Sequence, residues 1–328
     1  MAASLGSAQT VPGPWRALLL RHETVLFVIL VLALMLLATQ TDRFLTAENL
    51  LNQGRLMTEI GLIALPMTYI IITGGIDLSV GSIMGLSAIM LGYGWKNLGL
   101  PLEVSIGLTL LIGTAAGWVN GWFITRIKVP PLIMTLATLA LYRGLAEGIS
   151  QARSVRGYPE WFFILGQGEV WGAPTQLWVL LVAGLAAAIV LARTTFGRML
   201  YAIGNNETAA RFSGLPIARA KLWIYSLSGF CGAMAAWIFV SRVSTTRSDM
   251  GTGIELDVIA AVVLGGTSIF GGTGTILGTA LGVILVQLLK NGLALTGVKG
   301  DATIVVIGSV LILSILVSNL LQSRRTGD

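Results

Sequence analysis

The stretch GLIALPMTYIIITGGIDLSVGSIMGLSAIMLGY, residues 61–93, decides the fold class. It contains one charged residue, Asp77, between two apolar runs that each approach the length of a membrane-spanning helix. The whole chain has the same character, because 55% of its 328 residues are hydrophobic and 11% are charged, against about 25% charged in a typical soluble domain. Glycine recurs inside the apolar runs, where membrane helices use it for close packing. The composition excludes a water-soluble enzyme and predicts an all-α polytopic membrane protein.

Hydropathy predicts about ten membrane spans, since a hydrocarbon core of about 30 Å needs roughly 20 mostly apolar helical residues. The predicted spans are residues 24–40, 57–73, 79–95, 102–124, 130–150, 176–193, 222–241, 256–270, 275–295 and 302–320. The third and the eighth are short and glycine-rich, so each is compatible with a broken or re-entrant segment. The chain then divides into an N-terminal segment 1–23, a transmembrane domain 24–320 with a polar connection 193–221, and a tail 321–328.

The distribution of Lys and Arg predicts the orientation of the chain. With an even number of spans, eleven basic residues fall in connections on the side of the two termini and eight fall on the other side. The densest basic connection, 193–221, is on the side of the termini, so the positive-inside rule places both termini in the cytoplasm. The net charge of +6 fits this role, and no basic, aromatic-interleaved domain indicates nucleic-acid binding.

The two halves of the chain contain matching segments. G-I-D-L-S-V at 75–80 is echoed by G-I-E-L-D-V at 253–258, which contains Glu255 and Asp257. If each half holds five spans, the odd number places the two halves in opposite orientation, with Asp77 at the cytoplasmic face and Glu255 at the external face. The pattern therefore predicts two inverted five-helix repeats, which are typical of transporters; the alternative is chance similarity between apolar segments of low complexity.

A short capped helix is predicted in the long polar connection. Asn206 is a suitable N-cap, Glu207 favours the first turn through the helix dipole, and Gly214 can adopt the left-handed conformation at the C-terminus. A capped helix in a cytoplasmic connection favours a docking element for a soluble partner. The alternative is an ordinary helix at the lipid interface.

Asp77 allows two interpretations. A carboxylate inside the membrane is costly, which favours a role in gating or transport together with Ser79. However, Asp77 also precedes the third span closely enough to stabilise the N-terminus of that helix. Both interpretations stay open at this stage.

The glycine-rich run LGGTSIFGGTGTILGTALG, residues 264–282, is not a phosphate-binding loop, because no Gly-Lys-Ser/Thr follows and the flanks are membrane spans. Glycines at four-residue intervals predict tight helix crossings instead, in the rows Gly113, Gly117, Gly121 and Gly274, Gly278, Gly282. Because Cys231 and His22 are the single cysteine and histidine of the chain, we expect no metal site and no Ser/His/Asp catalysis.

Three motifs give the chain a family resemblance: TGGIDLSVGS at 73–82, YAIGNNETAARFSG at 201–214, and VLGGTSIFGGTGTILGTALGVILVQLLKNGLALTGV at 263–298. Together they resemble the permease subunits of bacterial ABC sugar importers of the ribose/xylose/galactose class, a group that also includes autoinducer-2 and rhamnose permeases. The resemblance runs from about residue 25 to residue 320 and is specific for the family rather than for the solute.

The resemblance implies a second permease subunit, cytoplasmic ATPase subunits that use ATP and Mg, and an external or periplasmic solute-binding protein. Residues that match the family's ATPase-coupling loop are Gly204, Asn206, Ala209, Ala210, Ser213 and Gly214, and we include their neighbours Glu207 and Arg211. The predicted function is inward movement of a sugar-like solute by alternating access, with no ATPase or other enzyme activity in this chain. The alternative is an ion-coupled secondary transporter with Asp77, Glu255 and Asp257 as cation or proton sites.

Overall fold

The computed structural model describes residues 22–40 and 44–298, together with residues 302, 305, 308, 309 and 312. The segment 1–21, the tail 321–328 and most of the predicted tenth span, 302–320, lie outside the described residues. The described part is mostly helical. Its long helices are α2 (His22–Gln40), α3 (Ala47–Ile72), α4 (Val80–Lys96), α5 (Leu102–Trp122), α6 (Pro131–Ser150), α8 (Thr175–Arg193), α11 (Ile217–Val243) and α13 (Ile276–Leu295).

Shorter elements join the long helices. A π-helical segment, η1 (Phe123–Ile127), continues α5, and a 3-10 turn, η2 (Glu160–Phe163), leads into α7 (Ile164–Gln167). The strands β1 (Glu169–Val170) and β2 (Ala173–Pro174) form a small antiparallel hairpin. The remaining short helices are α9 (Thr195–Asn205), α10 (Glu207–Phe212) and α12 (Ile254–Leu264).

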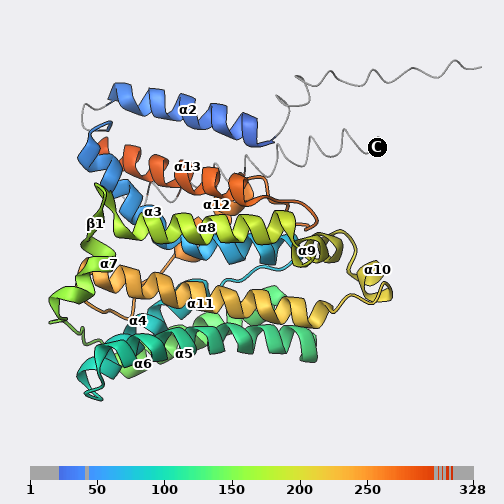
Figure 1. Ribbon diagram of the computed structural model, residues 1–328, viewed down its shortest axis with the longest axis horizontal. Helices are drawn as coiled ribbons and strands as arrows, with labels where there is room; N and C mark the ends of the chain where they lie inside the picture. Colours follow the sequence, from blue (N-terminus) through green and yellow to red (C-terminus); the bar gives the residue numbers. More distant parts are fainter. Residues whose placement is uncertain are drawn as a thin grey trace, which may run out of the picture.

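The long helices lie side by side, and the short elements other than α12 gather at the two ends of the bundle. Figure 1 shows α7 and β1 at one end and α9 and α10 at the opposite end. We call these the β1 end and the α10 end. The long axes of the helices connect the two ends, which is the arrangement expected when a helical bundle crosses a lipid bilayer.

Seven helices within the described residues are long and apolar enough to cross a membrane, with α5 and η1 counted together. The predicted third span corresponds to α4, which has 17 residues. The predicted eighth span, 256–270, is helical only as far as Leu264, and α12 has 11 residues. At 1.5 Å per residue α12 is about 16 Å long, so it does not cross a core of about 30 Å by itself.

Burial separates the helices into central and peripheral ones. In α3 and α11 most of the apolar window is buried inside the chain, 83% and 72%, whereas only 11% is buried in α2 and α8. The outward face of α8 carries apolar side chains such as Leu181, Val182 and Leu185. A contiguous apolar surface of this kind is unfavourable in water and favourable in lipid, which agrees with the membrane class predicted from composition.

The glycine row on α5 makes the predicted tight crossing. Gly113, Gly117 and Gly121 face α11, and a Cβ on Gly117 would lie 2.1 Å from the carbonyl oxygen of Tyr225. Gly229 of α11 meets the same row, since its Cβ would lie 2.0 Å from the carbonyl oxygen of Gly113. The two backbones touch, and only glycine permits this contact.

The second glycine row is only partly as predicted. A Cβ on Gly278 or Gly282 would lie 2.0 Å from a carbonyl oxygen, that of Gly265 or Ala261 respectively. Gly274, however, is not on the helix face, because α13 begins at Ile276. Thr275 is the N-cap of α13, so this helix starts after Gly274 and not before it, as the four-residue spacing had indicated.

We expect Gly229→Ala to lower the stability of the protein. Alanine is favoured over glycine in a helix by about 1 kcal/mol, but at this crossing the added methyl forces two backbones apart, at a typical cost of about 1–3 kcal/mol or more. Gly184→Ala in α8 is the matched control, because a Cβ there has nothing within 4 Å. Thermal unfolding of the detergent-purified variants measures the effect, and equal melting temperatures would contradict the proposed contact.

Candidate functional site

The connection between α8 and α11 folds into two helices that share one residue. Asn206 ends α9 and caps α10, and its side-chain Oδ1 accepts a hydrogen bond from the backbone N–H of Ala209 at 2.9 Å. This is the N-cap expected from the sequence, because a short polar side chain in extended backbone satisfies a free N–H of the first turn.

Gly214 closes α10 at its C-terminus. Its φ of +78° lies in the left-handed region, and its N–H donates to the carbonyl of Arg211. The N–H of Leu215 donates to the carbonyl of Ala210, which completes the pair of bonds of a Schellman motif. The short helix is therefore fixed at both ends by its own sequence.

Glu207 ties α10 to the bundle. Its carboxylate accepts a hydrogen bond from Arg211 at 3.0 Å and another from Lys221 of α11 at 2.7 Å. Partial burial by itself would raise the pKa of Glu207, but the hydrogen bonds and positive charges of Lys221 and Arg211 together hold this pKa below its ordinary value. The acid stays ionised and fixes the position of α10 relative to α11.

The helix α10 presents only part of the predicted coupling residues to the outside. Ala209, Arg211 and Ser213 are exposed, whereas Ala210 is buried against apolar residues of this chain, including Leu200. Ala210 is thus a packing residue within the chain, and its small size is explained by this contact. The prediction did not single out Phe212, the last residue of α10, whose side chain is 89% exposed. The signal in the sequence that could have identified Phe212 was an aromatic residue within a short, otherwise polar, capped helix.

Gly204 of α9 is half-buried and joins the capped segment, which comprises α9 and α10, to the bundle. Its Cβ would lie 1.8 Å from the carbonyl oxygen of Ile72, the last residue of α3. The same carbonyl accepts a hydrogen bond from the N–H of Gly272, and Tyr201 of α9 donates to the carbonyl of Gly274 at 2.6 Å. The capped segment, the end of α3 and the loop between α12 and α13 are therefore in direct backbone contact.

Asp77 is fully buried, and its carboxylate is held by two serines. Its Oδ1 accepts bonds from the N–H and the hydroxyl of Ser79, at 3.0 and 2.6 Å, and its Oδ2 accepts a bond from Ser228 of α11 at 2.8 Å. Asn120 of α5 donates to the same Ser79 hydroxyl. This network joins the start of α4 to α5 and α11, which agrees with the interpretation of Asp77 as a structural residue at a helix start.

Glu255 lies close to the same region. A Cβ on Gly81, in the first turn of α4, would lie 2.3 Å from Oε2 of Glu255. Ser228 is near the midpoint of α11, so Asp77 and Glu255 lie toward the middle of the bundle rather than at its two opposite faces. The expectation of opposite faces was wrong because α4 and α12 begin inside the bundle.

Arg143 of α6 contacts the loop before α12. Its guanidinium donates to the carbonyl oxygens of Ser248 and Met250 in that loop, and to that of Gly81. Arg143 thus fixes the loop that leads into α12 against α6.

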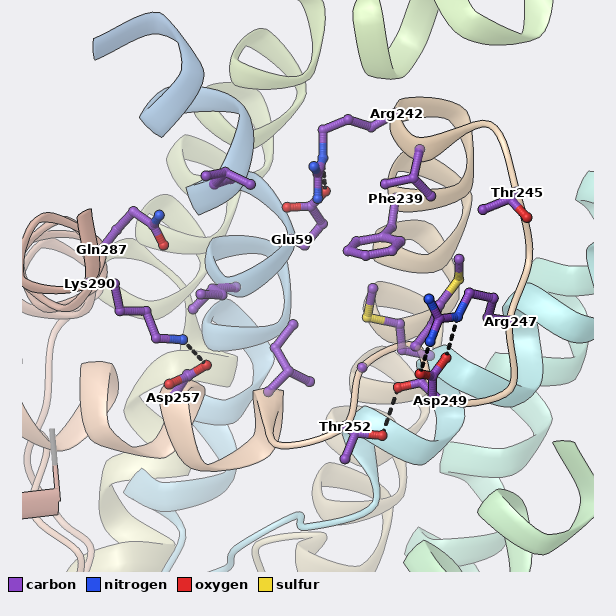
Figure 2. Close-up of a pocket in the computed structure, with 17 residues that line it drawn as sticks. Glu59, Phe239, Arg242, Thr245, Arg247, Asp249, Thr252, Asp257, Gln287 and Lys290 are labelled. Carbon is purple, nitrogen blue, oxygen red and sulfur yellow. Dashed lines mark hydrogen bonds and ion pairs between the residues drawn. The ribbon is translucent and has the colours of Figure 1, made fainter. Parts of the chain in front are cut away.

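A cavity of about 530 Å³ lies between α3, α11, α13 and the loop before α12. Figure 2 shows its charged residues in pairs. Arg242 donates to Glu59 at 2.9 Å, Lys290 forms an ion pair with Asp257, and Arg247 pairs with Asp249. Of the four pathway residues predicted from the sequence, only Asp257 lines this cavity. Within the described residues, no group of three His, Cys, Asp or Glu side chains is placed to hold a metal ion.

The long apolar helices define the chain as a multi-pass membrane protein. Residues 49–315 match the model of the family described as branched-chain amino acid transport system / permease component, and the chain belongs to this family. It is 38% identical over 300 residues, 90% of each chain, to the autoinducer 2 import system permease proteins LsrD of Yersinia enterocolitica and of Yersinia pseudotuberculosis. No solved structure matches the chain.

Membership of this family settles the class of function. The homologues are permease subunits of ABC importers, which are transport components rather than enzymes. An ion-coupled secondary transporter is not favoured by these relatives.

Proposed function

We propose that this chain conducts a neutral, sugar-like solute of the autoinducer-2 type into a bacterial cell by alternating access. The observation that carries the proposal is the 38% identity, over 90% of each chain, to permeases named for autoinducer 2 import. ATP and Mg are used by separate ATPase subunits, a solute-binding protein delivers the solute, and a second permease subunit completes the pathway. Both termini lie in the cytoplasm at the inner membrane.

The capped helix α10 is the proposed coupling element. It is fixed at both ends and tied to α11 by Glu207, so a force applied to α10 moves the bundle rather than a flexible loop. Gly204 and Gly272 place the same segment against the end of α3 and the loop after α12. The solute-binding protein then docks at the β1 end, where Trp171 is 89% exposed.

Two inverted repeats are part of the proposal. Two matching segments each lead into a helix inside the bundle. The segment 75–80 ends at the first residue of α4, and the segment 253–258 contains the first turn of α12. From there α4 runs toward the β1 end, since Gly92 packs against Thr246 and Val155, whereas α12 runs toward the α10 end, since the loop that follows it contacts Ile72 and Gly204. Opposite directions of matching helices are what inverted repeats require.

We expect ATP-dependent accumulation when the chain is reconstituted in vesicles with its ATPase, its second permease and its binding protein. Radiolabelled autoinducer 2 should accumulate with ATP and Mg, and should not accumulate when ATP is replaced by a non-hydrolysable analogue. Vesicles with a sodium or proton gradient and no ATP are the control. Accumulation in that control would overturn the proposal in favour of an ion-coupled transporter.

A further inference from the structure

The charged residues around the cavity add up to no net charge. Three acids, Glu59, Asp249 and Asp257, face three bases, Arg242, Arg247 and Lys290, and each acid is paired with one base. A site that binds an ion usually carries the opposite charge in excess. This cavity offers both hydrogen-bond donors and hydrogen-bond acceptors and is suited to a neutral polar molecule.

The ion pairs use only part of their hydrogen-bonding capacity. The Glu59 contact engages one carboxylate oxygen and the Nε of Arg242, and the Asp257 contact engages one carboxylate oxygen and the Nζ of Lys290. A carboxylate accepts about four hydrogen bonds and a guanidinium donates five. Each pair can therefore bind hydroxyl groups without being broken. Charged side chains inside a membrane domain are costly, which makes a functional site the first interpretation of such a group.

Apart from the ion pairs and the polar side chains of Thr245, Thr252 and Gln287, the walls of the cavity are mostly apolar. Phe239, Met84, Ile60 and Ile254 line it, and the guanidinium of Arg242 lies 4.8 Å from the centre of the Phe239 ring. A cyclic polyol has C–H faces that pack on apolar side chains and hydroxyl edges that bind carboxylates and cations. The volume of about 530 Å³ lies in the range of small-molecule sites.

We propose that this cavity binds the transported solute within the permease, and that it selects neutral, hydroxyl-rich molecules of monosaccharide size. The proposal rests on the proposed function and adds a site to it. An anion such as a phosphate ester would need a cation released from one of the pairs, which would leave the partner carboxylate without its counter-charge, at the greatest cost for the buried Glu59. The pairs therefore serve as donors and acceptors for neutral solutes and as a barrier to charged ones.

The competing explanation is that the ion pairs only hold helices together. The double variant Asp257→Asn with Lys290→Met distinguishes the two, because it removes both charges at once and leaves no unpaired ion. Its matched control is Arg55→Met with Glu169→Gln, which removes an ion pair of 2.7 Å that does not line the cavity. If the pairs are only structural, both double variants assemble and transport alike.

The test uses the full complex in vesicles with four labelled solutes: autoinducer 2, ribose, ribose 5-phosphate and leucine. ATP-driven uptake is measured for each solute. In parallel, Thr252→Cys is introduced without Cys231, and its labelling by a membrane-impermeant maleimide is followed with and without each solute. Thr252 lines the cavity and is exposed. Glu169→Cys, at the same end but outside the cavity, is the labelling control.

We expect autoinducer 2 or ribose to accumulate and to slow labelling at position 252 but not at position 169. The Asp257/Lys290 double variant should lose at least about tenfold in the uptake of that solute, the equivalent of one charge-assisted hydrogen bond, with normal amounts of bound ATPase. If a neutral solute is taken up but does not slow labelling at position 252, and the double variant takes it up normally, the cavity proposal is overturned and the proposed function stays intact. Accumulation and protection by ribose 5-phosphate or leucine would overturn the solute class. No ATP-driven uptake of any solute would overturn the proposed function and the cavity proposal with it.

Discussion

Replacing Phe212 by aspartate is expected to abolish ATP-driven uptake while the permease is still made and inserted. The side chain is 89% exposed on a helix that is fixed at both ends, so it is presented rigidly at the surface of the α10 end. Exposed aromatic residues on rigid elements are typical anchors of protein interfaces, and truncation of an anchor costs roughly 2–4 kcal/mol. That loss corresponds to about 30- to 1,000-fold weaker binding of the ATPase.

Copurification of the ATPase with the variant, together with uptake in vesicles, measures this effect. Arg211→Ala on the same helix is the control, because its exposed side chain pairs with Glu207 of its own helix and we expect only a small loss. Normal ATPase binding and uptake by the Phe212→Asp variant would show that the coupling surface lies elsewhere.

Ala210→Trp is not a clean test of the same surface. Because Ala210 is buried within the chain, a tryptophan there should displace α10 from the bundle and lower the abundance of the folded permease. The observed burial thus moves the expected contact with the ATPase from Ala210 to the exposed Ala209 and Phe212.

The second large effect is expected at Asp77. In Asp77→Ala, the hydroxyls of Ser79 and Ser228 and the N–H of Ser79 lose their acceptor in a fully buried site. Each orphaned donor costs about 1–3 kcal/mol, so the sum is a large fraction of the roughly 5–15 kcal/mol that stabilises a folded domain. We expect this variant to be degraded or to unfold at a much lower temperature than the natural protein.

Asp77→Asn separates a structural role from a role of the charge. Asparagine keeps one acceptor oxygen for Ser79, and the hydroxyl of Ser228 can rotate to accept from the new amide. We therefore expect a loss of only about 1 kcal/mol in stability, and uptake close to that of the natural protein. A stable Asp77→Asn variant without uptake would show that the carboxylate itself takes part in gating.

The local features of the capped segment were predictable from the sequence. The N-cap of Asn206 and the left-handed Gly214 depend on hydrogen bonds between residues a few positions apart. The same holds for the glycine row on α5, since a four-residue spacing places its members on one helix face. Such features need no knowledge of the other helices, which is why the sequence was sufficient.

Other features were decided by the tertiary structure. Ser228 lies 151 positions from Asp77, and Arg242 lies 183 positions from Glu59. Neither pairing follows from spacing or from the type of residue. The burial of Ala210 and the start of α12 inside the bundle were not predictable for the same reason, because both depend on contacts between residues distant in sequence.

The sequence by itself determined that the chain crosses a membrane repeatedly and which connection forms a capped helix. These properties follow from hydropathy and from short-range hydrogen bonds. The tertiary structure decided which face of each helix meets protein and which meets lipid, and therefore which charges form pairs and where a cavity remains. In a membrane protein both faces are apolar, so hydropathy does not distinguish them, and only the packing of helices distant in sequence does.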